Sequence, residues 1–409
     1  MNTSSNPAPS ASNTITHMHR FLRPHGLRAA AASMILVTPA LLSACASEPE
    51  APVDQAIPAP PAAAPAAPSS PTVVQRERSR WIASAWSDLP GWGEDRAREI
   101  WPALQRSCLR PAMGWERLCK QVVARIPGDD ASTHAWLTAN LEPYRIEAPD
   151  GRTEGLATGY FEPLVDASRR PRDAFRVPLY APPVDLLQRR PYWTRRQIDT
   201  LPDAQASLRG REIAYVADPL DALLLQVQGS GRLRLTDAQG RPQIVRVAYA
   251  GHNDQPYQSV GRWLIERGEL RPGEASWDAI RAWAQRNPER VDELLWANAR
   301  YVFFREEPLP DLQSGPRGAQ GVALTPGRSI AVDPLSIPYG TPVWLDTTEP
   351  LTARPLRRLV LAQDTGSAIV GAVRADFFWG WGSEAEQQAG RMKQSLRMWA
   401  LWPKASAVR

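Results

Sequence analysis

Apolar residues recur every three or four positions between residues 77 and 143, the spacing that gathers side chains on one face of a helix. The spacing continues through residues 92–109 and 115–126, and Asp130-Ala131-Ser132 has the polar character of an N-cap region before a further helix at 134–141. The pattern therefore predicts a helical region, which begins with Trp81, Ile82, Ala85 and Trp86.

From about residue 144, short apolar runs are separated by glycine and proline, a pattern typical of strands and turns. We predict a strand at 158–163 that runs into a turn, and another at 301–305. Residues 222–234 and 243–249 are predicted to form a hairpin around Ala238-Gln239-Gly240. Helices are predicted at 256–267, 276–286 and 288–297.

The last part of the chain is predicted to be a barrel. Residues 321–379 contain a series of short apolar runs with Gly and Pro between them, and a final helix near 383–392 is predicted to close the chain. Many short strands with such turns favour a closed sheet. The expected fold class is therefore mainly β with helices.

The first 44 residues have the pattern of an export signal. Three arginines and no acidic residue precede an apolar run at 29–40, which is too short for a membrane-spanning helix of about 20 residues. The run ends at Leu42-Ser43-Ala44-Cys45, which resembles the bacterial lipoprotein signal. This resemblance implies diacylation of Cys45 and, because Ala46 and not Asp follows, an anchor in the outer membrane. An ordinary signal peptide with an incidental cysteine is the alternative.

A tether follows the signal. Residues 46–72 contain eight prolines among alanine and serine, a composition that forms an extended, semi-stiff linker. We therefore assign 1–44 to the signal peptide and 45–76 to the anchor and tether. The whole chain has 409 residues and a net charge of +5, but three positive charges leave with the signal. The mature chain is nearly neutral at +2, so nucleic acid is not an expected partner.

Histidine and cysteine are scarce. Of five His and three Cys, only His134, His252, Cys108 and Cys119 remain beyond the lipidation residue. These numbers exclude a disulfide scaffold and a Cys-rich zinc site, and we expect no metal and no cofactor. We interpret His134 as structural and give His252, in a polar turn, little weight as a catalyst. A disulfide between Cys108 and Cys119 is expected in an oxidising compartment, with two buried thiols as the alternative.

Carboxylates are the remaining candidates for catalysis. Asp333, Asp364 and Asp376 lie at strand ends or beside aromatic residues in the predicted barrel. Desolvation raises a carboxyl pKa, and a protonated Asp is what a general acid for a glycosidic oxygen requires. Ordinary turn and capping aspartates are the alternative. The chain also has 16 Trp, and Trp379 and Trp381 near Asp376 are candidates to stack on sugar rings, with core packing as the alternative.

Six motifs occur along residues 155–390 in the order found in one family. The chain resembles the membrane-bound lytic murein transglycosylase A family. The motifs are TGYFEP at 158–163, QVQGSG at 226–231, YAG at 249–251 with YQSVG at 257–261, YVFF at 301–304, Asp333 with IPYG at 337–340, and AQDTGSAI at 362–369 leading to Asp376.

The resemblance implies a double-psi β-barrel catalytic domain made of residues 77–166 plus 300–402. A second β-rich domain, 167–299, would be inserted, with a substrate groove between the two. The implied partners are the glycan strands of peptidoglycan and the outer membrane, on its periplasmic side. Other cell-wall enzymes are further candidate partners.

The resemblance also implies a reaction and its residues. The β-1,4 bond between N-acetylmuramic acid and N-acetylglucosamine would be cleaved without water, leaving a 1,6-anhydro ring. Asp376 matches the acid/base position, Asp364 a supporting aspartate and Asp333 the third. Because an adjacent Arg would lower the pKa of the acid, we expect Arg374 to point away from Asp376. Residues at the groove-lining motifs are Thr158, Gly159, Tyr160, Gln228, Gly229, Ser230 and Tyr257.

Two other functions fit the residues. A true glycan hydrolase would use Asp376 and Asp364 as an acid–base pair and would add water to the product. A catalytically silent lipoprotein would bind peptidoglycan and recruit partners. Nucleic-acid binding is a distant third, because no basic stripe interleaved with aromatic residues occurs.

Overall fold

The computed structural model describes residues 72–236, 240–309 and 311–405. The predicted signal peptide, Cys45 and the predicted tether up to residue 71 lie outside the described residues. The last part of the segment assigned to the tether is structured, because β1 (Val73–Gln75) pairs antiparallel with β2 (Arg80–Ala83). In the part of the chain that the structure describes, no helix is long and apolar enough to cross a membrane.

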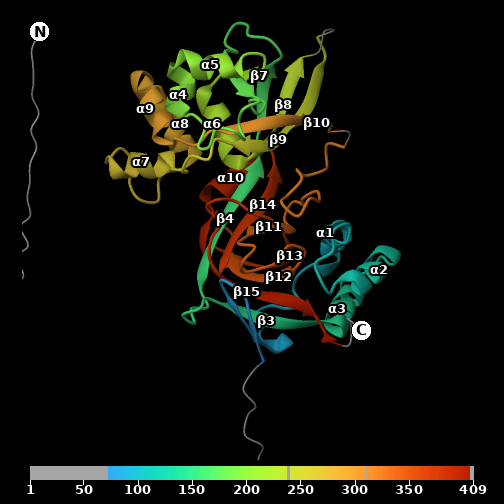
Figure 1. Cartoon of the computed structure of the whole chain (residues 1–409). Coiled ribbons are helices and arrows are strands. Elements are labelled where there is room, and N and C mark those ends of the chain that lie inside the picture. Colours follow the sequence, from blue (N-terminus) through green and yellow to red (C-terminus); the bar gives the residue numbers. More distant parts are fainter. Residues whose placement is uncertain (1–71, 237–239, 310, 406–409) are drawn as a thin grey trace, which may run out of the picture. The chain divides into compact units, whose positions relative to one another are not determined.

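Six strands close into a barrel in the order β15, β12, β13, β11, β14 and β4 (Figure 1). The ring closes because β4 pairs with both β14 and β15. The pairs β11–β13 and β14–β4 are parallel, and the other pairs of the ring are antiparallel. This is the predicted double-psi β-barrel. Its strands are β4 (Gly155–Glu162), β11 (Ser329–Val332), β12 (Pro342–Thr348), β13 (Pro355–Asp364), β14 (Arg374–Trp381) and β15 (Lys393–Pro403).

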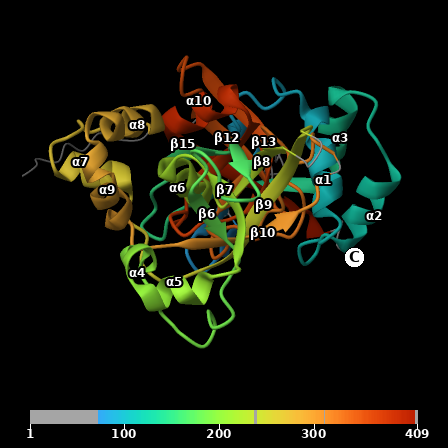
Figure 2. The ribbon, with the colours of Figure 1, turned by 90° about the horizontal axis from the view of Figure 1, so that it is seen from above.

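The N-terminal helices pack on one side of the barrel (Figures 1 and 2). β3 (Leu141–Glu147) connects them to the barrel by pairing with β15, and β2 pairs with β3. The helical elements are η1 (Trp86–Asp88), η2 (Ala97–Ile100), α1 (Trp101–Ser107), α2 (Glu116–Ala124) and α3 (Asp130–Asn140). A disulfide joins Cys108, directly after α1, to Cys119 of α2 and so ties these two helices together.

A second sheet of six strands has the order β10, β9, β8, β5, β7 and β6. Its strands are β5 (Leu164–Ser168), β6 (Val177–Tyr180), β7 (Glu212–Val216), β8 (Ser230–Thr236), β9 (Pro242–His252) and β10 (Val302–Glu307). Since β5 and β10 belong to it, this sheet begins before residue 167 and extends past residue 299. The mainly β fold with a second β-rich part is confirmed.

Helices fill the chain between the strands of the second sheet, and α7, α8 and α9 gather together (Figure 2). The last helix, α10 (Ser383–Arg391), packs on β4 and β14 of the barrel. The others are α4 (Arg195–Thr200), α5 (Pro202–Leu208), α6 (Pro219–Gln228), α7 (Val260–Glu266), α8 (Trp277–Arg286), η3 (Pro288–Arg290) and α9 (Val291–Ala297).

Three local predictions are wrong. Trp81 and Ile82 lie on β2 and not on a helix, and both side chains are buried. A short apolar run of this kind fits a buried strand as well as a helix, so the sequence pattern alone does not separate the two. Residues 222–228 belong to α6, which begins after the capping side chain of Asp218 and ends at Gly229 in the left-handed conformation. The chain also continues past its last helix into β15, which closes the barrel. The predicted pairing of β8 with β9 is confirmed.

Candidate active site

Two parallel neighbours in the barrel, β4 and β14, bring the candidate acid to its first partner. Asp376 of β14 lies opposite Thr158 of β4 in the register, and Ala375 and Phe377 on either side of Asp376 are buried in the core. Alternation along the strand therefore turns the Asp376 carboxyl away from the core. The Thr158 hydroxyl donates a hydrogen bond of 2.5 Å to its Oδ1.

Asp364 ends β13 and is held by a second residue of β4. The Tyr160 hydroxyl donates to its Oδ2 at 3.0 Å, and the backbone N–H of Ala319 donates to its Oδ1 at 2.9 Å. Burial raises the pKa of Asp364 to about 6; these hydrogen bonds and one from the Thr365 backbone oppose the rise, and the charge of Asp376 adds to it. Thr158 and Tyr160 thus bring the two aspartates into one site.

Burial also raises the pKa of Asp376, although the hydrogen bond from Thr158 and the charge of Arg374 pull it down in part. The expectation that Arg374 points away is wrong. Residues two apart on a strand share a face, and the Arg374 guanidinium donates to Thr158 Oγ1 at 2.9 Å. Among the described residues no ion pair within 4.0 Å joins Arg374 to Asp376, so the carboxyl is not held as a salt bridge.

Asp333 has different surroundings. Its side chain is buried, and Oδ2 accepts hydrogen bonds from the Arg78 guanidinium at 3.1 Å and the Gly371 N–H at 2.9 Å. Its Oδ1 accepts from the Leu335 N–H at 3.0 Å. These bonds fix the loops that follow β11 and β13. The contacts are those of a structural carboxylate, the alternative considered for all three aspartates.

Gly159 of β4 lies close to the backbone of α10. A Cβ at this position would stand 2.7 Å from Trp379 Nε1 and 2.9 Å from the Ala389 Cα. We expect Gly159→Ala to lower the free energy of unfolding by about 1–3 kcal/mol, as overpacking does. Urea denaturation measures this. Gly128→Ala is the matched control, because no atom would lie within 4 Å of its Cβ; equal stability of the two variants would contradict the packing role.

The other predicted groove residues belong to the second sheet and its helices. Gln228, at the end of α6, accepts a hydrogen bond from the backbone of Phe161 at 3.3 Å, next to Tyr160. Gly229 caps α6, and Ser230 begins β8. Tyr257 precedes α7, and the pKa of its hydroxyl is raised by burial. The structure therefore brings Gln228 next to the β4 site, whereas Tyr257 has no hydrogen bond to the residues of that site among the described contacts.

The two Trp residues singled out by the sequence have packing partners. Trp379 donates to the Met392 sulfur at 3.4 Å and lies against Phe377. The guanidinium carbon of Arg232 lies over the ring of Trp381, 4.0 Å from the ring centroid.

His252 shares a hydrogen bond with the Tyr249 hydroxyl, and burial lowers the pKa of His252. In the described ranges no three His, Cys, Asp or Glu side chains are grouped so as to hold a metal ion.

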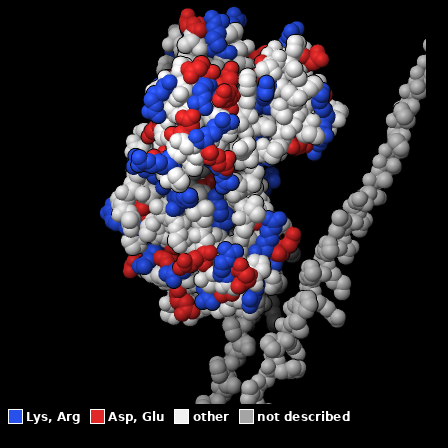
Figure 3. Space-filling model, turned by 90° about the vertical axis from the view of Figure 1, so that its left-hand side faces the viewer, with Lys and Arg blue, Asp and Glu red and all other residues white. Residues whose placement is uncertain are grey.

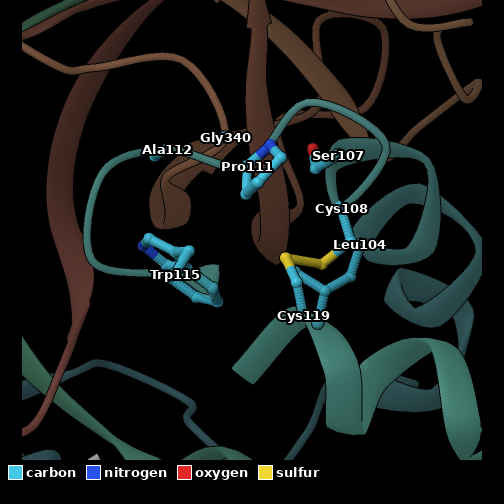
Figure 4. Close-up of a pocket in the computed structure, with 8 residues that line it drawn as sticks. All are labelled: Leu104, Ser107, Cys108, Pro111, Ala112, Trp115, Cys119 and Gly340. Carbon is cyan, nitrogen blue, oxygen red and sulfur yellow. A yellow bond between two sulfur atoms is a disulfide. The ribbon is translucent and has the colours of Figure 1, made fainter. Parts of the chain in front are cut away.

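The pocket drawn in Figure 4 lies elsewhere, beside the disulfide. Cys108, Cys119 and Trp115 line it on the helical side and Gly340 on the barrel side, and it has no space for a water-sized molecule. It is a packing contact between the helices and the barrel and not a candidate site.

On the face shown in Figure 3, basic and acidic side chains are interspersed, without a stripe of one sign.

Sequence reasoning missed two contributors to the site. The Ala319 N–H is a backbone donor and leaves no mark on the sequence. Glu162 could have been found, because it follows Thr158 and Tyr160 at intervals of two along one strand and so shares their face. Its side chain is completely buried and paired with two arginines.

Comparison with known proteins places these features in a family. Residues 156–305 match the MltA specific insert domain, and residues 328–402 match the 3D domain. Membrane-bound lytic murein transglycosylase A of Vibrio cholerae is 33% identical over 276 residues, which are 64% of this chain and 71% of that protein.

Solved structures agree. The lytic transglycosylase LtgG of Burkholderia pseudomallei is 44% identical over 83% of this chain and 99% of its own, with a TM-score of 0.58. MltA from Neisseria gonorrhoeae is 30% identical over 82% of this chain and 96% of its own, with a TM-score of 0.70. MltA of E. coli with bound chitohexaose is 26% identical over 75% of this chain and 89% of its own, with a TM-score of 0.61. With the Vibrio relative matched over more than two thirds of its length, the chain belongs to the membrane-bound lytic murein transglycosylase A family.

Proposed function

We propose that the protein is a lytic transglycosylase that cleaves the β-1,4 bond between N-acetylmuramic acid and N-acetylglucosamine in peptidoglycan. The observation that carries this proposal is the pair Asp376 and Asp364, both with raised pKa and both hydrogen-bonded to β4. The names of the relatives and the chitohexaose bound to E. coli MltA support a glycan substrate.

Asp376 acts first as an acid. Its protonated carboxyl gives a proton to the glycosidic oxygen, and the bond from that oxygen to C1 of the muramic residue breaks. The carboxylate of Asp376 then takes the proton of the C6 hydroxyl, whose oxygen bonds to C1 and forms the 1,6-anhydro ring. The nucleophile belongs to the substrate, so proximity replaces the second carboxylate that a hydrolase needs to activate water.

The residues around Asp376 fit both halves of this cycle. Burial favours the protonated form that donates, whereas the Thr158 hydrogen bond and the nearby Arg374 charge stabilise the carboxylate left behind. Asp364 stabilises the positive charge that develops at C1. We assign Asp333 to the structure of the barrel. The proposed glycan contacts are Thr158, Tyr160, Gln228, Gly229, Ser230 and Tyr257, in a groove between the barrel and the inserted domain.

We further propose that the enzyme works from the membrane. Residues 1–44 would be removed as a signal peptide, and lipid on Cys45 would anchor the chain to the outer membrane on its periplasmic side. The Pro/Ala-rich tether would carry the catalytic part toward the glycan strands. The family name supports membrane association.

Mass spectrometry of muropeptides released by residues 46–409 tests the reaction. The expected products carry 1,6-anhydro ends and are one water lighter than hydrolysis products. Products that carry the added water would instead show that Asp376 and Asp364 form a hydrolytic pair. Intact sacculi would favour a binding lipoprotein and would contradict the proposal.

A further inference from the structure

Glu162 is a buried carboxylate at the end of β4 that the proposed reaction does not use. Its side chain is fully buried between two arginines of the second sheet, Arg232 of β8 and Arg246 of β9. Arg232 Nε lies 2.8 Å from Oε2 and Arg246 Nε 2.5 Å from Oε1, and both arginine side chains are almost completely buried. The aromatic ring of Trp381 from β14 covers the Arg232 guanidinium.

The same two arginines hold the segment that leads to the active site. Arg232 donates to the backbone carbonyls of Leu312 at 2.6 Å and Ser314 at 3.1 Å, and Arg246 donates to that of Ser314 at 2.5 Å. Five residues later, the Ala319 N–H donates to Asp364. The segment lies tightly on β13, because a Cβ at Gly318 would stand 2.5 Å from the Gln363 carbonyl oxygen.

We propose that Glu162, Arg232 and Arg246 form a positioning unit that sets the hydrogen bonds on Asp364 from two directions. One direction is β4, where Glu162 lies two residues after Tyr160, the residue that donates to Oδ2. The other is the 312–319 segment, which ends at the donor to Oδ1. The unit thereby couples the arrangement of the second sheet to a carboxylate of the barrel. The inference rests on the proposed function and names positioning residues for it.

The expected signature is a shift of the pH–rate profile. Hydrogen bonds from Tyr160 and Ala319 to the carboxylate lower the pKa of Asp364 against the effect of burial. The charged or titratable groups that act on Asp364 are Asp376 and Tyr160, and Asp364 in turn acts on Tyr339. Weaker hydrogen bonds raise the pKa of Asp364, so the carboxylate that the reaction needs is lost at a higher pH. The fall of kcat on the acid side of the pH–rate profile, called the acid limb from here on, should therefore occur at a higher pH.

Arg246→Lys is the first test variant. It keeps the positive charge but replaces the planar guanidinium, whose nitrogens bond both the Glu162 carboxylate and the Ser314 carbonyl, by a single ammonium group. We expect kcat on sacculi near pH 6 to fall about threefold to tenfold, less than on removal of the Asp364 carboxylate itself, with KM changed less than about threefold. The midpoint of the acid limb should shift to a higher pH by about half a pH unit to one pH unit. Glu162→Gln should shift it in the same direction, and Glu162→Asp should restore part of kcat.

Asp346→Asn is the matched control. Asp346 is also a largely buried carboxylate between two arginines, but it lies on β12, and among the described contacts its carboxylate accepts hydrogen bonds from Arg357 and Arg397 and from no residue of β4 or of the 312–319 segment. It should lower Tm and leave the acid limb in place. If Arg246→Lys and Glu162→Gln, at temperatures where they are folded, keep the wild-type acid limb and kcat, the positioning role is wrong. An Asp376→Asn enzyme as active as wild type would instead overturn the proposed function itself.

Discussion

Asp376→Asn is expected to reduce muropeptide release from sacculi by at least about a thousandfold, the middle of the range of about 10² to 10⁴ for one general acid–base group. The loss is large because the same carboxyl carries both proton transfers of the proposed reaction, and an amide can neither give nor take these protons. Turnover is measured by chromatography of the released muropeptides. The substitution is nearly isosteric, and the Thr158 hydroxyl can still donate to the amide oxygen.

The same substitution should not weaken the fold at neutral pH. Burial raises the pKa of Asp376, so the ionised form is less favourable in the folded than in the unfolded state. Removing the ionisable group therefore leaves Tm unchanged or raises it at pH 7, and this gain should vanish when the pH falls below the pKa of the unfolded carboxyl. A stability–activity trade-off of this kind is typical of active sites.

Asp333→Asn is the matched control for Asp376→Asn. Asp333 is a second buried aspartate of the barrel, but it accepts hydrogen bonds from Arg78 and two backbone N–H groups. Its substitution should lower Tm and leave most of kcat in the enzyme that remains folded. The assignment of the acid would have to be reversed if Asp333→Asn abolished turnover of folded enzyme and Asp376→Asn did not.

The contrast between these aspartates shows how far a sequence can identify a site. A carboxyl at a strand end or beside aromatic residues is expected to be desolvated, and burial raises the pKa of both Asp364 and Asp376 in the structure. Asp333 has the same local pattern. Its partner Arg78 lies 255 residues earlier in the chain, so no local pattern could show that it is paired.

Arg374 and α6 show the two other limits. Arg374 was expected to avoid the acid on electrostatic grounds, but strand periodicity places both side chains on one face, and Thr158 lies between them as a shared partner. The sequence pattern predicts a strand over 222–234, but residues 222–228 belong to α6. This segment is helical in the structure, with the Asp218 side chain capping its start, Pro219 in its first turn and Gly229 in the left-handed conformation at its end. These start and stop residues, and not the apolar run itself, are the sequence signal for a helix here.

Asp364→Asn is expected to lower kcat by about tenfold to a hundredfold and to remove the acid limb of the pH–rate profile. In the wild type, the pKa of Asp364 is raised to about 6, mainly by burial. The proposed reaction needs its carboxylate, so kcat should fall as the pH drops through about 6 and this carboxyl becomes protonated. The proposed reaction needs Asp376 in its protonated form, so its ionisation should give the opposite limb, on which kcat falls as the pH rises. The two carboxyls lie close together, so the profile reports apparent pKa values of the pair.

Measuring kcat from pH 4 to pH 9 with wild type and Asp364→Asn separates the two roles. With an uncharged Asn at 364, the carboxylate whose protonation gives the acid limb is absent, and the rate should stay flat toward acid until the enzyme unfolds. The high-pH limb should remain, because it belongs to Asp376, whose hydrogen bond from Thr158 is unchanged. An acid limb that persists near pH 6 in Asp364→Asn would assign it to another group and would remove Asp364 from the proposed stabilisation of C1. Loss of the high-pH limb alone would exchange the roles of the two aspartates.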